Sequence, residues 1–66
     1  MKNQQHEFNG GRSAIVLAYL PVNEAWTVYR QDGDIHGLQR IHATHNEALM
    51  DFDQRIDFIE QMEREA

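Results

Sequence analysis

Histidines are the residues of this chain that most directly suggest metal or acid–base chemistry. His42 and His45 lie three residues apart with Glu47 close by, a spacing that zinc ligands can have. A structural zinc site needs four ligands and a catalytic one needs three plus water, so His6 or His36 would have to be recruited from elsewhere. Because positions in a strand and at a helix start account for His42 and His45, we expect no metal site and no cofactor.

Carboxylates offer a second kind of chemistry. Asp53 and Asp57 are one helical turn apart, and Asp51 is nearby. General acid–base catalysis needs a pocket that removes one carboxyl from water and shifts its pKa, whereas a solvated helix face does the opposite. Ser13 is the only serine, and no glycine-rich phosphate loop is present. The sequence therefore predicts no catalytic residues and a protein that is not an enzyme.

The net charge of −5 is carried entirely by the last third of the chain. Residues 44–66 contain seven acids and two arginines, whereas residues 1–43 contain four acids and four bases. Such a one-sided field favours partners with a basic surface. A solubilising role for this acidic surface is the alternative interpretation.

Length and composition limit the class of protein. A chain of 66 residues forms one domain at most and buries only about 60% of its unfolded surface, so extra support is typical. Cysteine is absent, which excludes disulfides and leaves self-association, so we expect a homodimer. The longest apolar run, residues 14–20, is too short to span a bilayer. We expect a soluble cytoplasmic protein with no membrane contact.

Three segments have the length and residue types of β-strands, namely 13–20, 26–30 and 35–43. Asp32-Gly33 predicts a type I′ hairpin turn between the second and third strands, and Gly37 predicts a bulge in the third. Residues 1–12 read as a flexible polar leader that ends in two glycines. The folded domain is therefore expected to span residues 13–66.

The acidic segment from Thr44 to Ala66 predicts one helix. Thr44 and Glu47 form a capping-box pattern. Apolar residues then recur on one stripe: Ala48, Leu49, Phe52, Ile56, Ile59 and Met62. We expect an α+β fold in which a three-stranded antiparallel sheet (β-β-β-α order) carries this C-terminal helix on one face.

Two helix residues, Phe58 and Met50, fall off the apolar stripe. An apolar side chain on a polar helix face can mark a contact with another molecule, although single exposed apolar residues are also normal. We therefore predict a partner-binding patch composed of Met50, Asp53, Asp57, Phe58 and Glu60.

Two resemblances inform the function. The stretch Tyr29-Arg30-Gln31-Asp32-Gly33, with Gly37-Leu38 and Thr44-x-x-Glu47-Ala48, is similar in outline to the arm-type DNA-binding domains of tyrosine integrases. That resemblance implies nucleic-acid binding through a sheet face with Arg30, Arg40, Trp26 and Tyr29. Six bases against eleven acids make nucleic acid an unlikely partner.

The small acidic chain also resembles, in type, accessory proteins of phages and mobile elements that inhibit host nucleases or defence complexes, including anti-CRISPR-like inhibitors. The leading hypothesis is therefore a non-catalytic protein-binding module for a partner with a basic surface. A nucleic-acid-binding regulator and a structural homodimer component are the alternatives.

Overall fold

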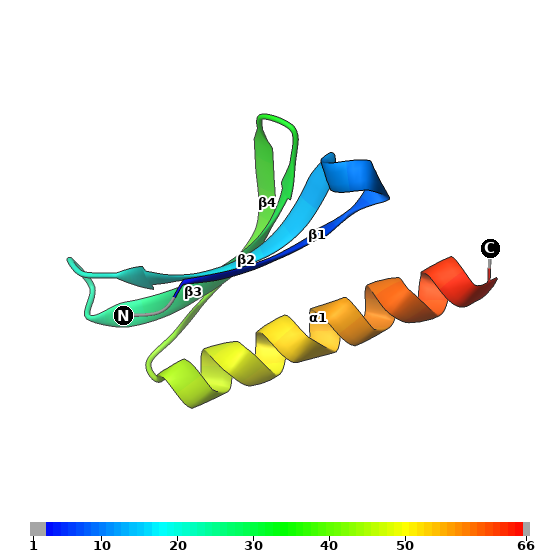
Figure 1. The fold of residues 1–66 in the computed structure, drawn as a ribbon. Coiled ribbons are helices and arrows are strands. Elements are labelled where there is room, and N and C mark those ends of the chain that lie inside the picture. The colour runs from blue at the N-terminus through cyan, green and yellow to red at the C-terminus, as the bar shows by residue number, and fades with distance from the viewer. Residues whose placement is uncertain (1–2, 66) are drawn as a thin grey trace.

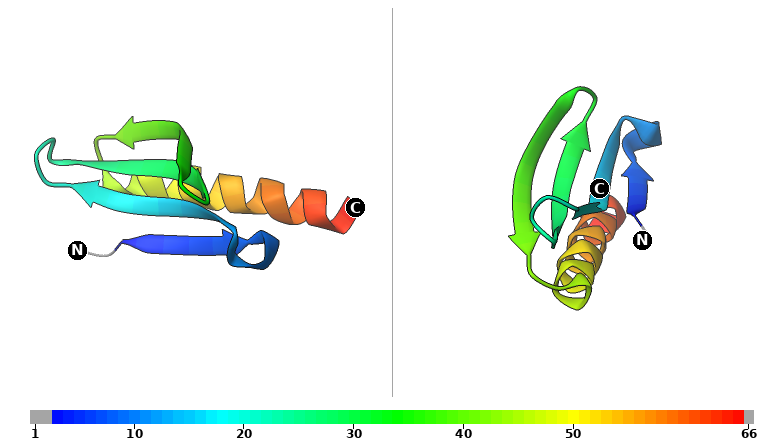
Figure 2. Two further views of the ribbon diagram at one scale, coloured as in Figure 1. Left: turned by 90° about the horizontal axis from the view of Figure 1, so that it is seen from above. Right: turned by 90° about the vertical axis from the view of Figure 1, so that its left-hand side faces the viewer.

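A computed structural model describes residues 3–65 as an antiparallel β-sheet with one long helix across one of its faces (Figures 1 and 2). The sheet order β1-β2-β3-β4 follows the chain, so each strand pairs with the next one. The elements are β1 (Gln4–Phe8), the short 3-10 turn η1 (Asn9–Gly11), β2 (Ser13–Leu20), β3 (Ala25–Asp32), β4 (Ile35–His42) and α1 (His45–Glu65). The α+β class with a C-terminal helix is confirmed.

The sheet has four strands, so the prediction of three is wrong. Gln4–Phe8 lies within the segment expected to be a leader, yet it pairs antiparallel with β2. Its polar composition hides the strand, because only Phe8 is apolar and buried at 9% exposure. Asn9, Gly10 and Gly11 adopt positive φ angles of 53°, 67° and 86°, and they reverse the chain between β1 and β2. Residues 1 and 2 of the expected leader lie outside the described residues.

The hairpin between β3 and β4 differs from its prediction by one residue. Asp32 pairs with Ile35, so the two-residue loop is Gly33-Asp34. Of these two, only Gly33 has a positive φ, 61°, as a type II′ turn requires, whereas type I′ needs positive φ at both positions. The bulge predicted from Gly37 is present one residue later: Leu38 has a φ of 54°, and the register shifts between Val28 and Arg30.

The core lies between the sheet and α1. Alternation along β2 directs Ile15 and Leu17 toward the helix, and Val28 of β3 pairs with Leu17. From α1, Phe52 and Ile59 complete the buried cluster. The predicted stripe is thus confirmed for its central residues: Ala48, Phe52 and Ile59 are buried, and Leu49 and Ile56 pack at the edge.

α1 begins at His45 with Thr44 as its cap. The Glu47 amide donates to Thr44 Oγ1 at 3.2 Å, and the Thr44 hydroxyl donates to the Glu47 carboxylate at 3.0 Å. At the other end, the last turns of α1 extend beyond the sheet (Figures 1 and 2). Met62 is therefore 57% exposed, and its assignment to the buried stripe is wrong. Within residues 3–65, no helix combines the length and the apolar composition that crossing a membrane requires.

Candidate functional site

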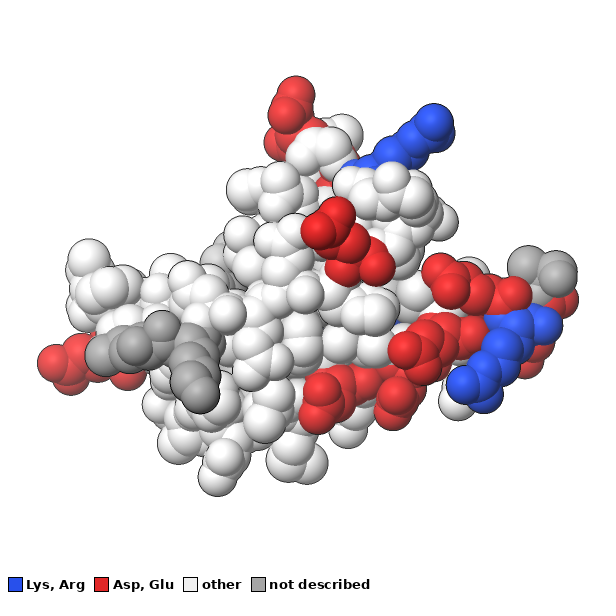
Figure 3. Space-filling view, viewed as in Figure 1, with Lys and Arg blue, Asp and Glu red and all other residues white. Residues whose placement is uncertain are grey.

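The outer side of α1 carries four of the five residues predicted to bind a partner. Met50 is 64% exposed, Asp53 and Asp57 are exposed, and Glu60 is half-buried. None of the ion pairs within residues 3–65 involves Asp53, Asp57 or Glu60. Figure 3 shows acidic side chains following one another along the helix. We refer to Met50, Asp53, Asp57 and Glu60 as the acidic flank.

Phe58 lies on a different side of the helix. At 100° per residue its direction differs from that of Asp53 by about 140°. It is 64% exposed and lines a groove between α1 and β4, which none of the acidic-flank residues lines. The structure thus brings four of the predicted residues together and separates Phe58 from them.

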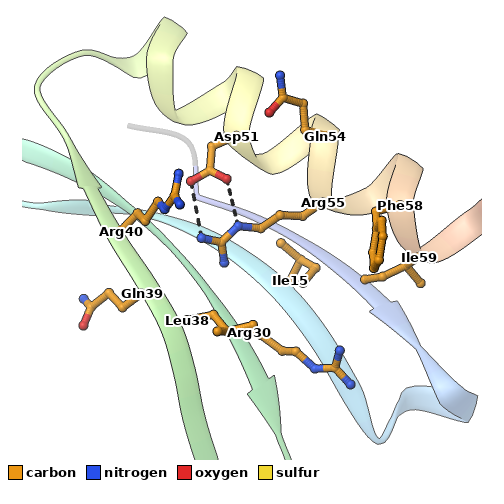
Figure 4. Close-up of a pocket in the computed structure, with 10 residues that line it drawn as sticks. All are labelled: Ile15, Arg30, Leu38, Gln39, Arg40, Asp51, Gln54, Arg55, Phe58 and Ile59. Atoms are coloured by element: carbon orange, nitrogen blue, oxygen red, sulfur yellow. Dashed lines mark hydrogen bonds and ion pairs between the residues drawn. The ribbon is translucent and has the colours of Figure 1, made fainter.

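The groove between α1 and β4 has a volume of about 450 Å³. Its polar lining includes the side chains of Arg30, Arg40, Arg55 and Asp51, and its exposed apolar walls are Leu38 and Phe58 (Figure 4). Three of the protein's six Lys and Arg residues therefore line one groove beside a predominantly acidic helix. Counting charge along the sequence did not reveal this groove, because Arg30 and Arg40 come from strands and Arg55 from the helix.

Asp51 is the central anion of this groove. Arg55 Nε donates to Asp51 Oδ1 at 2.8 Å, at an i, i+4 spacing that favours such pairs, and His42 Nε2 lies 2.8 Å from Asp51 Oδ2. Burial alone would raise the pKa of Asp51, but the hydrogen bonds with His42 and Arg55 outweigh it and hold the pKa below its usual value. Glu60 and Arg64 have the same i, i+4 spacing, but they form none of the ion pairs of residues 3–65.

The other two arginines of the groove differ in their partners. Arg30 Nε donates to Asp32 Oδ2 at 2.9 Å, and Ser13 Oγ donates to Asp32 Oδ1 at 2.6 Å. These hydrogen bonds, Arg30 first, lower the pKa of Asp32. Arg40 takes part in none of the ion pairs within residues 3–65. Arg30 is therefore locally neutralised, whereas Arg40 is not.

The bulge in β4 helps to form the groove. Leu38 is in the left-handed region, which a non-glycine side chain occupies at a cost of about 1 kcal/mol or more. The extra residue places Gly37, which has no side chain, opposite Arg30. A Cβ at Gly37 would meet nothing within 4 Å, but the bulged residue Leu38, and not Gly37, lines the groove. Gly37 and the position of Phe58 off the apolar stripe were the two sequence signals that fell in or beside this region.

The two histidines considered as metal ligands have other neighbours. His42 lies against Asp51, while the ring of His45 lies 4.5 Å from that of Trp26. Within residues 3–65, no three side chains of His, Cys, Asp or Glu are grouped as metal ligands. His42 is therefore held by Asp51 and His45 packs on Trp26, while the buried Nε2 of His45 has no hydrogen-bond partner among residues 3–65.

Among residues 3–65, no helix or strand packs on the sheet face opposite α1 (Figures 1 and 2). A hollow of about 250 Å³ on this face is lined by residues that include Leu20, Tyr29 and His36. The rings of Tyr29 and His36 lie 5.0 Å apart. Trp26 is three residues before Tyr29 in β3, so its side chain lies on the opposite face, where it packs against the core under the helix. The aromatic and basic residues considered for nucleic-acid binding therefore occupy two faces of the sheet.

Comparisons of the chain with protein-family models, with curated proteins and with solved structures found no match.

Proposed function

We propose that this protein is a non-catalytic binding module that presents the acidic flank of α1 to a partner protein with a basic surface. The observation that supports the proposal best is the row formed by Asp53, Asp57 and Glu60, which takes part in no ion pair within residues 3–65. Successive members of this row are about 6 and 4.5 Å apart along the helix axis. Unpaired carboxylates in a row complement a basic surface and speed its approach.

Met50 adds an apolar contact to this flank. Its side chain is 64% exposed and extends from the same side of the helix as Asp57. Protein interfaces gain most of their affinity from a few apolar or aromatic anchors, while rim charges set orientation and rate. Met50 would supply the anchor and the carboxylates the orientation.

A partner that normally binds nucleic acid fits this arrangement best. A basic surface that binds phosphates would accept carboxylates in their place, which is how phage or mobile-element accessory inhibitors of the DNA-mimic type act. The protein would then be an inhibitor that occupies the nucleic-acid site of a host protein.

Charge reversal on the flank tests the proposal. Immobilised protein is used to capture partners from a bacterial lysate at rising salt, with Asp53→Lys plus Asp57→Lys beside the wild type. Glu24→Lys plus Asp34→Lys is the matched control, because it changes the net charge equally at two exposed turn positions. We expect the flank variant to lose a salt-sensitive partner that the control retains. Added duplex DNA should release this partner from the immobilised wild type. Equal loss in both variants, or no salt-sensitive partner, would contradict the proposal.

Self-association through the open sheet face is the second candidate function. Ile41 is 55% exposed on this face, beside the hollow that Leu20 and Tyr29 line. A second copy would cover this surface and add the apolar burial that so short a chain lacks. Sedimentation analysis of the wild type should give a dimer that Ile41→Lys dissociates. Val22→Lys, at a turn residue that is 97% exposed, is the control and should leave the dimer intact. A monomeric wild type at high concentration would rule the dimer out.

A further inference from the structure

We propose that the groove between α1 and β4 binds a carboxylate attached to an apolar body, with Arg40 and Arg55 holding the carboxylate and Leu38 and Phe58 flanking the apolar body. This site is separate from the proposed function, because it lies on the other side of the helix and attracts the opposite charge. The two can therefore succeed or fail independently.

The charge balance of the groove calls for one more anion. Arg30 is neutralised by Asp32, and Arg55 by Asp51. Arg40 then remains as a single excess positive charge, since it takes part in no ion pair within residues 3–65. A carboxylate carries one negative charge and brings the groove to neutrality, whereas a phosphate monoester carries about −1.5 to −2 and overshoots it.

Free hydrogen-bond donors point to the same chemistry. Arg55 donates from Nε and Nη2 to Asp51 at 2.8 and 3.4 Å, whereas its Nη1 is buried and has no acceptor among residues 3–65. A buried donor without an acceptor is costly, and more so on a charged group. Because Nη1 is covered, a ligand carboxylate reaches it only when the Arg55 side chain shifts toward the groove; one carboxylate oxygen would then accept from Nη1 and the other from the Arg40 guanidinium. In Figure 4 these two side chains extend from β4 and α1 into the groove.

The apolar walls define the rest of the ligand. Leu38 and Phe58 are 74% and 64% exposed at the groove, and each is a large apolar side chain in contact with water. The volume of about 450 Å³ falls in the range of small-molecule sites. Leu38 lines the groove with its backbone in the left-handed region, and residues in such strained conformations cluster at active sites and ligand clamps. An aromatic or branched body between these two side chains would exclude that water.

The test is an NMR titration at neutral pH in which 3-phenylpropionate, the probe, is added to the isotope-labelled full chain. The Nε–H signals of Arg40 and Arg55 report on the carboxylate, and the methyl signals of Leu38 report on the phenyl ring. We expect saturable shifts at all three residues with a dissociation constant of about 0.1 to 5 mM. The neutral amide of the probe and plain propionate should each bind at least about tenfold more weakly.

Variants separate the site from general charge effects. Arg40→Gln should weaken binding about tenfold or more, and Phe58→Ser should weaken 3-phenylpropionate but not propionate. Arg12→Gln removes an exposed arginine that does not line the groove and should bind like the wild type. Both groove variants change exposed side chains, so their amide spectra should remain those of the folded protein. Equal affinities for acid and amide, or equal losses in Arg40→Gln and Arg12→Gln, would overturn the proposal.

Two further probes identify the source of the carboxylate. N-acetylphenylalanine and its amide represent the C-terminal residue of a peptide, and tighter binding of this acid than of 3-phenylpropionate would indicate a protein terminus. Weaker binding would indicate a free organic acid. Phenyl phosphate is the remaining comparison, and its tighter binding would overturn the choice of a carboxylate. Arginine shifts that follow protein concentration without any probe would overturn it as well, because a second copy would then fill the groove.

Discussion

The two flanks of α1 differ in the surroundings of their carboxylates more than in their sequence. Asp51 and Asp53 are two residues apart, yet Asp51 is held by Arg55 and His42 while Asp53 faces water and belongs to no ion pair within residues 3–65. The difference comes from β4, which brings His42 beside Asp51 and Arg40 into the groove next to it. A helix that is predominantly acidic in sequence therefore presents two surfaces of different charge in the folded protein.

The apolar residues off the core stripe follow the same division. Met50 extends from the acidic flank, and Phe58 forms a wall of the groove. Both are 64% exposed, so exposure alone does not distinguish them. Their neighbours do, and each flank has one apolar residue next to its own kind of charge. An exposed apolar residue beside charged side chains is the composition expected of a binding surface, whether its charge is negative or positive.

The largest effect is expected from a comparison of Phe52 with Phe58. Phe52 is 5% exposed in the core, so Phe52→Ala should cost about 3–5 kcal/mol, close to the whole stability of so small a domain. Phe58→Ala removes a side chain that is mostly in water and should cost less than about 1 kcal/mol. Urea unfolding followed by Trp26 fluorescence measures both. Similar losses would mean that the groove wall belongs to the core and is not a binding surface.

Local patterns predicted most of this fold. The capping pattern at Thr44 placed the helix start, and the apolar run 13–20 was correctly predicted as a strand. Both faces of that run are largely apolar, so only the structure shows that Ile15 and Leu17 lie under the helix. β1 was missed because an edge strand needs only one buried anchor, here Phe8, and its other residues are polar. The sequence pattern could not show that the two glycines connect β1 to β2.

The candidate site was predictable only on one flank. The acidic flank lies on consecutive turns of one helix, so periodicity alone groups its residues. The groove is lined by residues that are far apart in the chain, such as Arg40 of β4 and Arg55 of α1. No local periodicity in the sequence indicates that they lie together. The position of Phe58 off the stripe was a valid signal, but it was assigned to the wrong neighbours because the groove was not foreseen.

A smaller effect is expected from a comparison of Asp51 with Asp53. Asp51→Asn leaves Arg55 and His42 without a charged partner at a site where the side chains are only 13–19% exposed, so it should cost about 1–2 kcal/mol. Asp53→Asn changes an exposed carboxylate and should alter the stability by less than about 0.5 kcal/mol. Urea unfolding at neutral pH measures both. Equal effects would show that Asp51 is as solvated as the acidic flank.

Acid provides an independent way to test the same ion pair. Because its folded-state pKa is lowered, the Asp51 carboxylate stabilises the protein fully above the unfolded value of about 4. That stabilisation is lost as the pH falls through the lower folded-state pKa, when Asp51 takes up a proton and its attraction to Arg55 ends. Asp51→Asn has no such carboxylate to protonate. The stability difference between wild type and Asp51→Asn should therefore be largest near neutral pH and shrink below about pH 4. A difference that stays constant through this range would show that Asp51 acts through packing or neutral hydrogen bonds, and that its charge is not what distinguishes the groove from the acidic flank.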